Sequence, residues 1–159
     1  MPPRSEVTNV VIAGLGGQGV LKASDILAGA VFRAGFDVKK SEIHGMSQRG
    51  GSVSSDVRFG AKVFSPMVPP GQADCLVVLA PSQVEVARPM LKAAGVLIEP
   101  GMIDESRLIN RKSLNVALLG VLARHLDLAE HLWHAAIRAA LPEKLHAANL
   151  QAFAMGKKP

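Results

Sequence analysis

Two glycine-containing segments hold the residue types best suited to ligand binding. The first segment, G-L-G-G-Q-G, occupies residues 14–19. Glycine has no Cβ, so it adopts positive φ angles and lets a ligand approach the backbone closely. The first N–H groups of a helix that follows such a turn favour a phosphate or a carboxylate. We therefore interpret this segment as a candidate cofactor-binding turn, comprising Gly14, Gly16, Gly17, Gln18 and Gly19.

The same turn fits the G-x-G-x-x-G pattern of dinucleotide-binding folds. In those folds an acidic residue about 20 positions later binds the ribose hydroxyls. Here that region holds Lys39 and Lys40, with Glu42 just beyond them. The pattern therefore disfavours NAD. It leaves two alternatives open: a nucleotide with an extra phosphate, such as NADP or coenzyme A, and a turn that only packs a strand on a helix.

The second segment, residues 41–51, is polar and glycine-rich and follows a predicted strand. Ligands in open α/β sheets bind at the carboxyl ends of strands. The side chains here offer donors to a carboxylate, a phosphate or an amide, although a solvated loop would have the same composition. The candidate cofactor-binding residues are Ser47, Gln48, Arg49, Gly50 and Gly51, and the candidate active-site wall is His44 with Arg49.

Elsewhere, the residue pattern disfavours catalysis and metal binding. The single cysteine, Cys75, excludes an intrachain disulfide and any cysteine cage for zinc or iron–sulfur within this chain. It lies in an apolar run, which favours an inert buried thiol over a nucleophile. His131 and His134 could ligate zinc from one helix, but no suitably spaced acid accompanies them. The sequence therefore assigns no catalytic residue and no metal ligand.

Short β-branched runs alternate with helical spacing through the first hundred residues, as in βαβ units around a mostly parallel sheet. Residues 53–59 alternate apolar with polar side chains, which predicts an antiparallel strand near an edge. Helices are expected from Val20, from a capping box at Ser82 and Glu85, and in three segments of the last third, one of them after Asp127 and Glu130. We predict a Rossmann-like three-layer α/β fold with a mostly parallel sheet, one antiparallel edge element and a C-terminal helical segment.

Composition supports one folded domain over residues 1–159. With 48% hydrophobic and 19% charged residues, the 159-residue chain can bury one core, which argues against separate cofactor and substrate domains. The net charge of +5 favours anionic partners. Nucleic acid is disfavoured because the basic residues are scattered and there are only five Phe, one Trp and no Tyr. The start of the chain has no signal-peptide pattern and no 18-residue apolar stretch follows, so we expect a cytoplasmic protein without membrane contact.

Taken together, the two glycine segments resemble the gamma-type subunit or domain of 2-oxoacid:ferredoxin oxidoreductases. The paired motifs are G-L-G-G-Q-G-V and, about 25 residues later, S-E-I-H-G-M-S-Q-R-G-G-S-V. Within that family, the chain is most similar to the beta subunit of indolepyruvate ferredoxin oxidoreductases. The similarity continues through residues 73–78, 95–98, 115–120 and 149–153, so it covers most of the chain.

The resemblance implies a non-autonomous subunit of a hetero-oligomeric enzyme. Such an enzyme decarboxylates indolepyruvate or another aryl-2-oxoacid, passes electrons to ferredoxin and releases an acyl-CoA. Thiamine diphosphate, Mg²⁺ and the iron–sulfur clusters are then held by larger partner subunits, and this chain shapes the active-site or coenzyme A cleft. On that basis His44, Ser47, Gln48 and Arg49 would face the partner or ligand, with Arg49 the best partner for an anion.

Two other functions remain as alternatives to this interpretation. One is a free-standing NADP- or coenzyme A-type nucleotide-binding module in which Lys39 and Lys40 read the extra phosphate. The other is a structural role in which the basic surface docks an acidic partner without touching a ligand.

Overall fold

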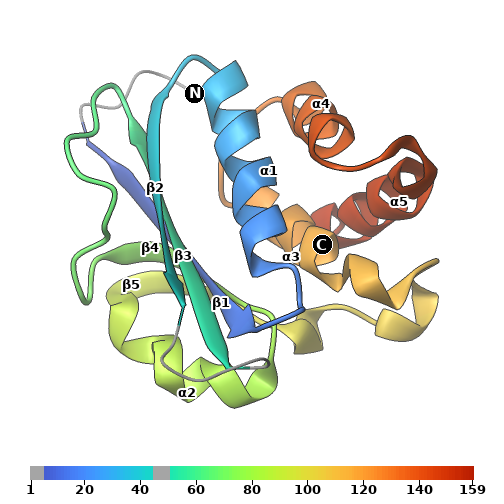
Figure 1. Cartoon of the computed structure of the whole chain (residues 1–159), viewed down its shortest axis with the longest axis horizontal. Helices are drawn as coiled ribbons and strands as arrows, with labels where there is room; N and C mark the ends of the chain where they lie inside the picture. Colours follow the sequence, from blue (N-terminus) through green and yellow to red (C-terminus); the bar gives the residue numbers. More distant parts are fainter. Residues whose placement is uncertain (1–5, 45–50) are drawn as a thin grey trace.

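A five-stranded sheet with strand order β2-β3-β1-β4-β5 forms the centre of the molecule (Figure 1). The computed structural model describes residues 6–44 and 51–159. The strands are β1 (Thr8–Leu15), β2 (Asp37–His44), β3 (Ser52–Gly60), β4 (Ala73–Val78) and β5 (Leu91–Ile98).

The antiparallel strand predicted near an edge at residues 53–59 is confirmed, but it is the second strand of the sheet and not the edge element itself. β3 lies between β2 and β1 and runs antiparallel to both, whereas β4 pairs parallel with β1 and with β5. The short connection after β2 permits a hairpin but not a parallel crossover. Val57 and Asp56, on opposite faces of β3, are both at most 1% exposed, so the strand is buried on both sides. The edge strand on this side of the sheet is β2.

Helices lie on both faces of the sheet, which confirms the three layers (Figure 1). Among the described residues, one face carries α1, α3, α4 and α5, and the other carries α2 with the 3₁₀ turns on either side of it. The helices are α1 (Val20–Arg33), α2 (Val84–Ala87), α3 (Leu114–Ala123), α4 (Glu130–Ala140) and α5 (His146–Lys157). None of the helices in the described ranges is long and apolar enough to cross a membrane.

Alternation along β1 divides the apolar residues between the two faces. Val10 and Ile12 join the large core under α1, α3, α4 and α5, whereas Val11 and Ala13 join a smaller cluster that reaches α2. Within the large core, the rings of Trp133 and Phe153 lie 5.4 Å apart and connect α4 to α5. The four-helix face therefore holds most of the buried apolar surface.

Two helix starts differ from the capping boxes predicted for them. Ser82 lies inside the 3₁₀ turn Pro81–Gln83 and makes no capping hydrogen bond, because Pro81 begins the turn one residue earlier. At α4 the N-cap is Ala129, which has no side-chain acceptor to offer. Apolar packing stabilises both helices instead: α2 packs on the sheet, and α4 packs on α1 and α5.

Candidate functional site

The glycine turn joins β1 to the N-terminus of α1, as its pattern predicts. Gly17 and Gly19 have φ angles of +87° and +83°, which L side chains rarely adopt. Gly19 is the N-cap of α1, and a Cβ there would lie 2.5 Å from Asn115 Nδ2. At Gly17, by contrast, a Cβ would meet nothing within 4 Å. Gly17 therefore borders open space that a ligand can enter.

Gln18 uses its side chain to hold the turn together. Its Oε1 accepts a 2.8 Å hydrogen bond from Leu15 N, and its Nε2 donates to Leu79 O at 3.4 Å. These contacts join the carboxyl end of β1 to the residue after β4. The predicted contribution of Gln18 to a ligand site is thus one of positioning the backbone, since both ends of the amide are already engaged.

The polar loop is joined to the glycine turn at its far end. Gly16 N donates a 2.9 Å hydrogen bond to Gly51 O, directly before β3. His44 closes β2, where its backbone pairs with Val53. The candidates Ser47, Gln48, Arg49 and Gly50 lie outside the described residues. The two predicted segments therefore meet at the carboxyl end of β1, through the hydrogen bond between Gly16 and Gly51.

A pocket of about 390 Å³ opens beside the glycine turn, which we call the switch-point pocket. It lies at the carboxyl end of β1. From β1 the chain continues through α1 to β2 on one side of the strand, whereas β4 pairs with β1 on its other side. Open α/β sheets bind ligands at such a point. Gly17, Gln18 and Gly19 form one wall. The rest of the lining is formed by Leu79, Glu105, Arg111, Lys112, Leu114 and Asn115.

The cations of this pocket, Arg111 and Lys112, were not among the sequence-based candidates. They lie on the 3₁₀ turn Arg111–Ser113, which Asn110 caps by accepting from Lys112 N at 2.9 Å. Asn115 Nδ2 then donates to Gly19 O at 3.1 Å and ties the start of α3 to the glycine turn. A polar Asn-Arg-Lys-Ser cluster before an apolar helix was the available signal. No pattern within this cluster indicates that it contacts the glycine turn, which lies more than 90 residues earlier in the chain.

Lys40, one of the two lysines considered for reading an extra phosphate, is engaged elsewhere. Its Nζ pairs with Asp25 on α1 and lies 3.0 Å from Glu42 Oε1. Burial alone would lower the pKa of Lys40, but the hydrogen bonds to Asp25 and Glu42 outweigh it and raise the pKa. Lys39 and Lys40 also lie in the middle of β2, away from its carboxyl end. This placement weakens the NADP alternative.

The remaining reactive residues have packing roles. Cys75 is 4% exposed, and burial, together with the charge of Asp74, raises the pKa of its thiol to about 11, as expected for an inert residue. The ring of His134 lies edge-on to Phe153, at 6.0 Å. Among the described residues, no group of three or more His, Cys, Asp or Glu side chains is placed to hold a metal ion.

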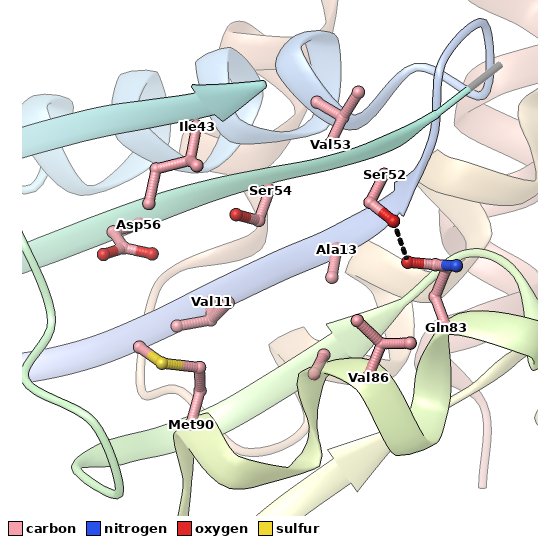
Figure 2. Close-up of a pocket in the computed structure, with 11 residues that line it drawn as sticks. Val11, Ala13, Ile43, Ser52, Val53, Ser54, Asp56, Gln83, Val86 and Met90 are labelled. Atoms are coloured by element: carbon pink, nitrogen blue, oxygen red, sulfur yellow. Dashed lines mark hydrogen bonds between the residues drawn. The ribbon is translucent and has the colours of Figure 1, made fainter. Parts of the chain in front are cut away.

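A second cavity, the apolar groove, occupies the sheet face that carries α2 (Figure 2). It measures about 180 Å³ and runs between β1, β3 and the helical segment Pro81–Met90. At one end Ser52 Oγ donates to Gln83 Oε1 at 2.7 Å. Its other lining residues are Val11, Ala13, Ile43, Val53, Ser54, Asp56, Val86, Ala87 and Met90.

Of the described residues that line the apolar groove, Asp56 is the only acid. Its Oδ2 accepts a 2.9 Å hydrogen bond from Val68 N. Burial raises the pKa of its carboxyl group, and the hydrogen bond from Val68 only partly opposes that shift. The groove thus combines apolar walls with one carboxylate that is costly to ionise.

Comparison with known proteins gives one consistent set of relatives. Residues 9–101 match the family described as pyruvate ferredoxin/flavodoxin oxidoreductase. The chain is 32% identical to the indolepyruvate oxidoreductase subunit IorB of Thermococcus kodakarensis, over 94% of each chain. It is likewise 32% identical to the subunit of the same name from Pyrococcus horikoshii, again over 94% of each.

Solved structures share the fold. The gamma subunit of a keto/oxoacid ferredoxin oxidoreductase from Geobacter sulfurreducens superposes with a TM-score of 0.80 at 22% identity, covering 96% of this chain and 95% of that one. A 2-oxoglutarate:ferredoxin oxidoreductase chain from Magnetococcus marinus, solved with 2-oxoglutarate, coenzyme A and succinyl-CoA bound, also gives 0.80 at 20% identity. There the match covers 97% of this chain but 31% of the longer one.

Proposed function

Since the chain belongs to the pyruvate ferredoxin/flavodoxin oxidoreductase family, we propose that it serves as the small subunit of a 2-oxoacid:acceptor oxidoreductase. The assembled enzyme converts a 2-oxoacid and coenzyme A to an acyl-CoA and CO₂ and passes two electrons to a ferredoxin-type acceptor. Relatives named as indolepyruvate oxidoreductase subunits, matched over 94% of their length, favour indolepyruvate or another aryl-2-oxoacid.

The redox and decarboxylation groups belong, in this proposal, to larger partner subunits. Iron–sulfur clusters need several thiolate ligands, and this chain has one cysteine, which is buried. The described residues likewise offer no acidic cluster for the Mg²⁺ of thiamine diphosphate. Thiamine diphosphate supplies the carbon–carbon bond cleavage when bound to a partner. The residues of this chain bind and orient coenzyme A.

The observation that carries this assignment is the switch-point pocket. A Cβ at Gly17 would meet nothing within 4 Å, and Arg111 and Lys112 line the same pocket. A diphosphate fits this combination, because backbone N–H groups at a helix start and a guanidinium both donate to phosphate oxygens. Gly51 accepts a hydrogen bond from the same turn. We keep Arg49 and His44, on the basis of the sequence alone, as the proposed further residues of this wall.

The test uses the complex purified from the native host and assayed with a panel of 2-oxoacids. We expect Arg111→Ala to raise the KM for coenzyme A about tenfold, through the loss of a charged hydrogen bond, without changing the KM for the 2-oxoacid. Lys62→Ala, an exposed lysine on the far end of the sheet, is the matched control. An unchanged KM for coenzyme A in both Arg111→Ala and Arg49→Ala would refute the assignment.

Calorimetry of the isolated chain separates this proposal from the free-standing nucleotide module. The proposal expects the chain alone to turn over no oxoacid and to show no preference for NADPH over NADH. Micromolar binding of NADPH that is lost in Lys39→Ala would support the module instead.

A further inference from the structure

The apolar groove contains one polar atom whose bonding the surrounding chain leaves incomplete. Asp56 lines the groove and is 1% exposed, and its Oδ2 accepts the hydrogen bond from Val68 N. Its second oxygen, Oδ1, has no hydrogen-bond partner among the described residues. A buried carboxylate oxygen without a donor costs free energy, so the groove favours a ligand that supplies one.

This oxygen can be reached from the groove. Among the described residues, the buried side-chain atoms that are both unpaired and sealed from the surface are Ser55 Oγ, Ser113 Oγ and Trp133 Nε1. Asp56 Oδ1 is not one of them, so it keeps accessible surface, and the cavity that Asp56 lines is the groove. In Figure 2 the carboxylate lies on the groove side of β3, near the hydroxyl of Ser54.

The groove itself supplies no positive charge to this carboxylate. No Lys, Arg or His is among the described residues that line it. Arg58 attracts the charge of Asp56, but its guanidinium donates to Asn9 Oδ1 and Ser65 O. The complement to Asp56 Oδ1 is therefore a protonated nitrogen, because a charged N–H donates to a carboxylate more strongly than a neutral one does.

The volume and the walls of the groove fit a single ring. The groove measures about 180 Å³. This is slightly larger than the roughly 150 Å³ of an apolar protein cavity that binds benzene. Val11 and Ala13 line it from β1, and Val86 and Met90 line it from the helical segment (Figure 2). Val86 and Ile43 are exposed, so the groove opens to solvent.

We propose that the apolar groove binds a small molecule that combines one aromatic ring with a protonated nitrogen, such as an arylalkylamine or an arylamidine. The ring packs between Val11 and Met90, and the nitrogen donates to Asp56 Oδ1. No described residue lines both this groove and the switch-point pocket. The site is therefore separate from the one proposed for coenzyme A, and it does not rest on the proposed function.

The test titrates the full chain at neutral pH with benzamidine, benzamide and benzoate, and follows binding by calorimetry. The three probes share one ring and nearly one shape, but they are a cation, a neutral molecule and an anion. We expect saturable binding of benzamidine, about tenfold weaker binding of benzamide and no binding of benzoate, because the charged hydrogen bond is lost and then replaced by repulsion. Equal affinity for benzamidine and benzoate, or no saturable binding of benzamidine, would overturn the proposal.

Asp56→Asn isolates the role of the carboxylate. An asparagine can still accept from Val68 N, but without the charge benzamidine should bind about tenfold more weakly. Asp37→Asn is the matched control, because Asp37 Oδ2 likewise accepts from a backbone N–H, that of Val63 at 2.8 Å, and does not line the groove. The proposal is also overturned if the two variants bind benzamidine equally well.

Ser54→Leu tests whether the groove is where the probes bind. The larger side chain fills space near Asp56 without removing the carboxylate, so benzamidine and benzamide should both lose binding, with a melting curve to verify the fold. Unchanged binding of both probes would locate them outside the groove and contradict the proposal. Failure of the coenzyme A proposal would show separately, in the KM of Arg111→Ala, since Arg111 does not line the groove.

Discussion

The two faces of the sheet are built from the same strands but differ in what covers them. On one face, four helices bury Ile12, Phe59 and Trp133 completely (Figure 1). On the other, one short helical segment leaves the apolar groove, with Ile43 43% exposed and Val86 63% exposed. The first face has the continuous core of a self-sufficient domain, whereas the second has only a partial one.

This contrast teaches that burial and stability are concentrated on one side of the sheet. Apolar burial contributes in proportion to the area removed from water, and close packing makes each change of volume costly. The groove side has less area to lose and more room to adjust. Substitutions on the two faces should therefore differ in size even when the chemical change is the same.

The largest effect is expected from one substitution made on both faces. Ile12→Ala should lower the free energy of unfolding by about 4 kcal/mol, because it opens a cavity under α1. Ile43→Ala, which lines the groove, should cost less than about 1 kcal/mol. Urea unfolding followed by Trp133 fluorescence measures both. Equal losses would mean that the two faces do not differ in packing.

The crossing of α3 and α5 on the covered face should be nearly as sensitive. A Cβ at Gly156 would overlap Ala117 O, so Gly156→Ala must push the helices apart, at a cost of about 3 kcal/mol. Gly101→Ala is the matched control, because a Cβ there meets nothing within 4 Å. A melting temperature for Gly156→Ala close to that of Gly101→Ala would contradict the tight crossing.

The contribution of Asp56 to stability should change with pH in the opposite direction to that of Asp37, because the pKa of Asp56 is raised and that of Asp37 is lowered. Burial raises its folded-state pKa above the unfolded value of 3.8, so the folded chain binds the proton more tightly and stability falls as pH rises through this interval. Asp56→Asn should therefore raise the melting temperature at pH 7 by about 3 °C. This gain should vanish below the unfolded-state pKa.

Asp37 supplies the contrasting case for that measurement. The hydrogen bond from Val63 N lowers the pKa of Asp37, so its stabilising effect is present above pH 3.8 and is lost as pH falls. Asp37→Asn should lower the melting temperature at pH 7. Shifts of the same sign in Asp37→Asn and Asp56→Asn would show that burial of Asp56 does not control its titration.

The smallest effect is expected at Val86, which stands on the outer wall of the groove. Val86→Ser should change the free energy of unfolding by less than about 0.5 kcal/mol, because the side chain is mostly in water in this chain. Chemical denaturation provides the measurement. A loss above about 1 kcal/mol would mean that Val86 is packed like a core residue. The two faces of the sheet would then differ less in how much a substitution lowers the free energy of unfolding.

Much of the fold could be predicted because local patterns carry the information. The apolar run before Gly14, the helical spacing from Val20 and the alternation at residues 53–59 each describe one element, and each element forms. The position of β3 inside the sheet could not be predicted, since alternation indicates a strand with two different faces and is silent on its neighbours. The capping boxes failed because Pro81 and the backbone at Ala129 set those helix starts.

The site was only half predictable for a similar reason. The glycine turn can be recognised from six consecutive residues. Arg111 and Lys112, in contrast, lie beside it because Asn115 donates a hydrogen bond to Gly19 and holds the start of α3 there. That contact depends on how α3 packs beside α1, which no short window of sequence contains. Gln18 was placed correctly in the turn, but that its amide would join Leu15 to Leu79 depends on β4 lying next to β1.

The hairpin of β2 and β3 has a consequence for how this protein can change. Eight residue pairs, from Asp37 with Gly60 to His44 with Val53, fix the register of the two strands. None of these pairs involves residues 45–50, so the register of β2 and β3 does not depend on the side chains of that segment. New ligand preferences could arise there by substitution alone, while the scaffold keeps its stability.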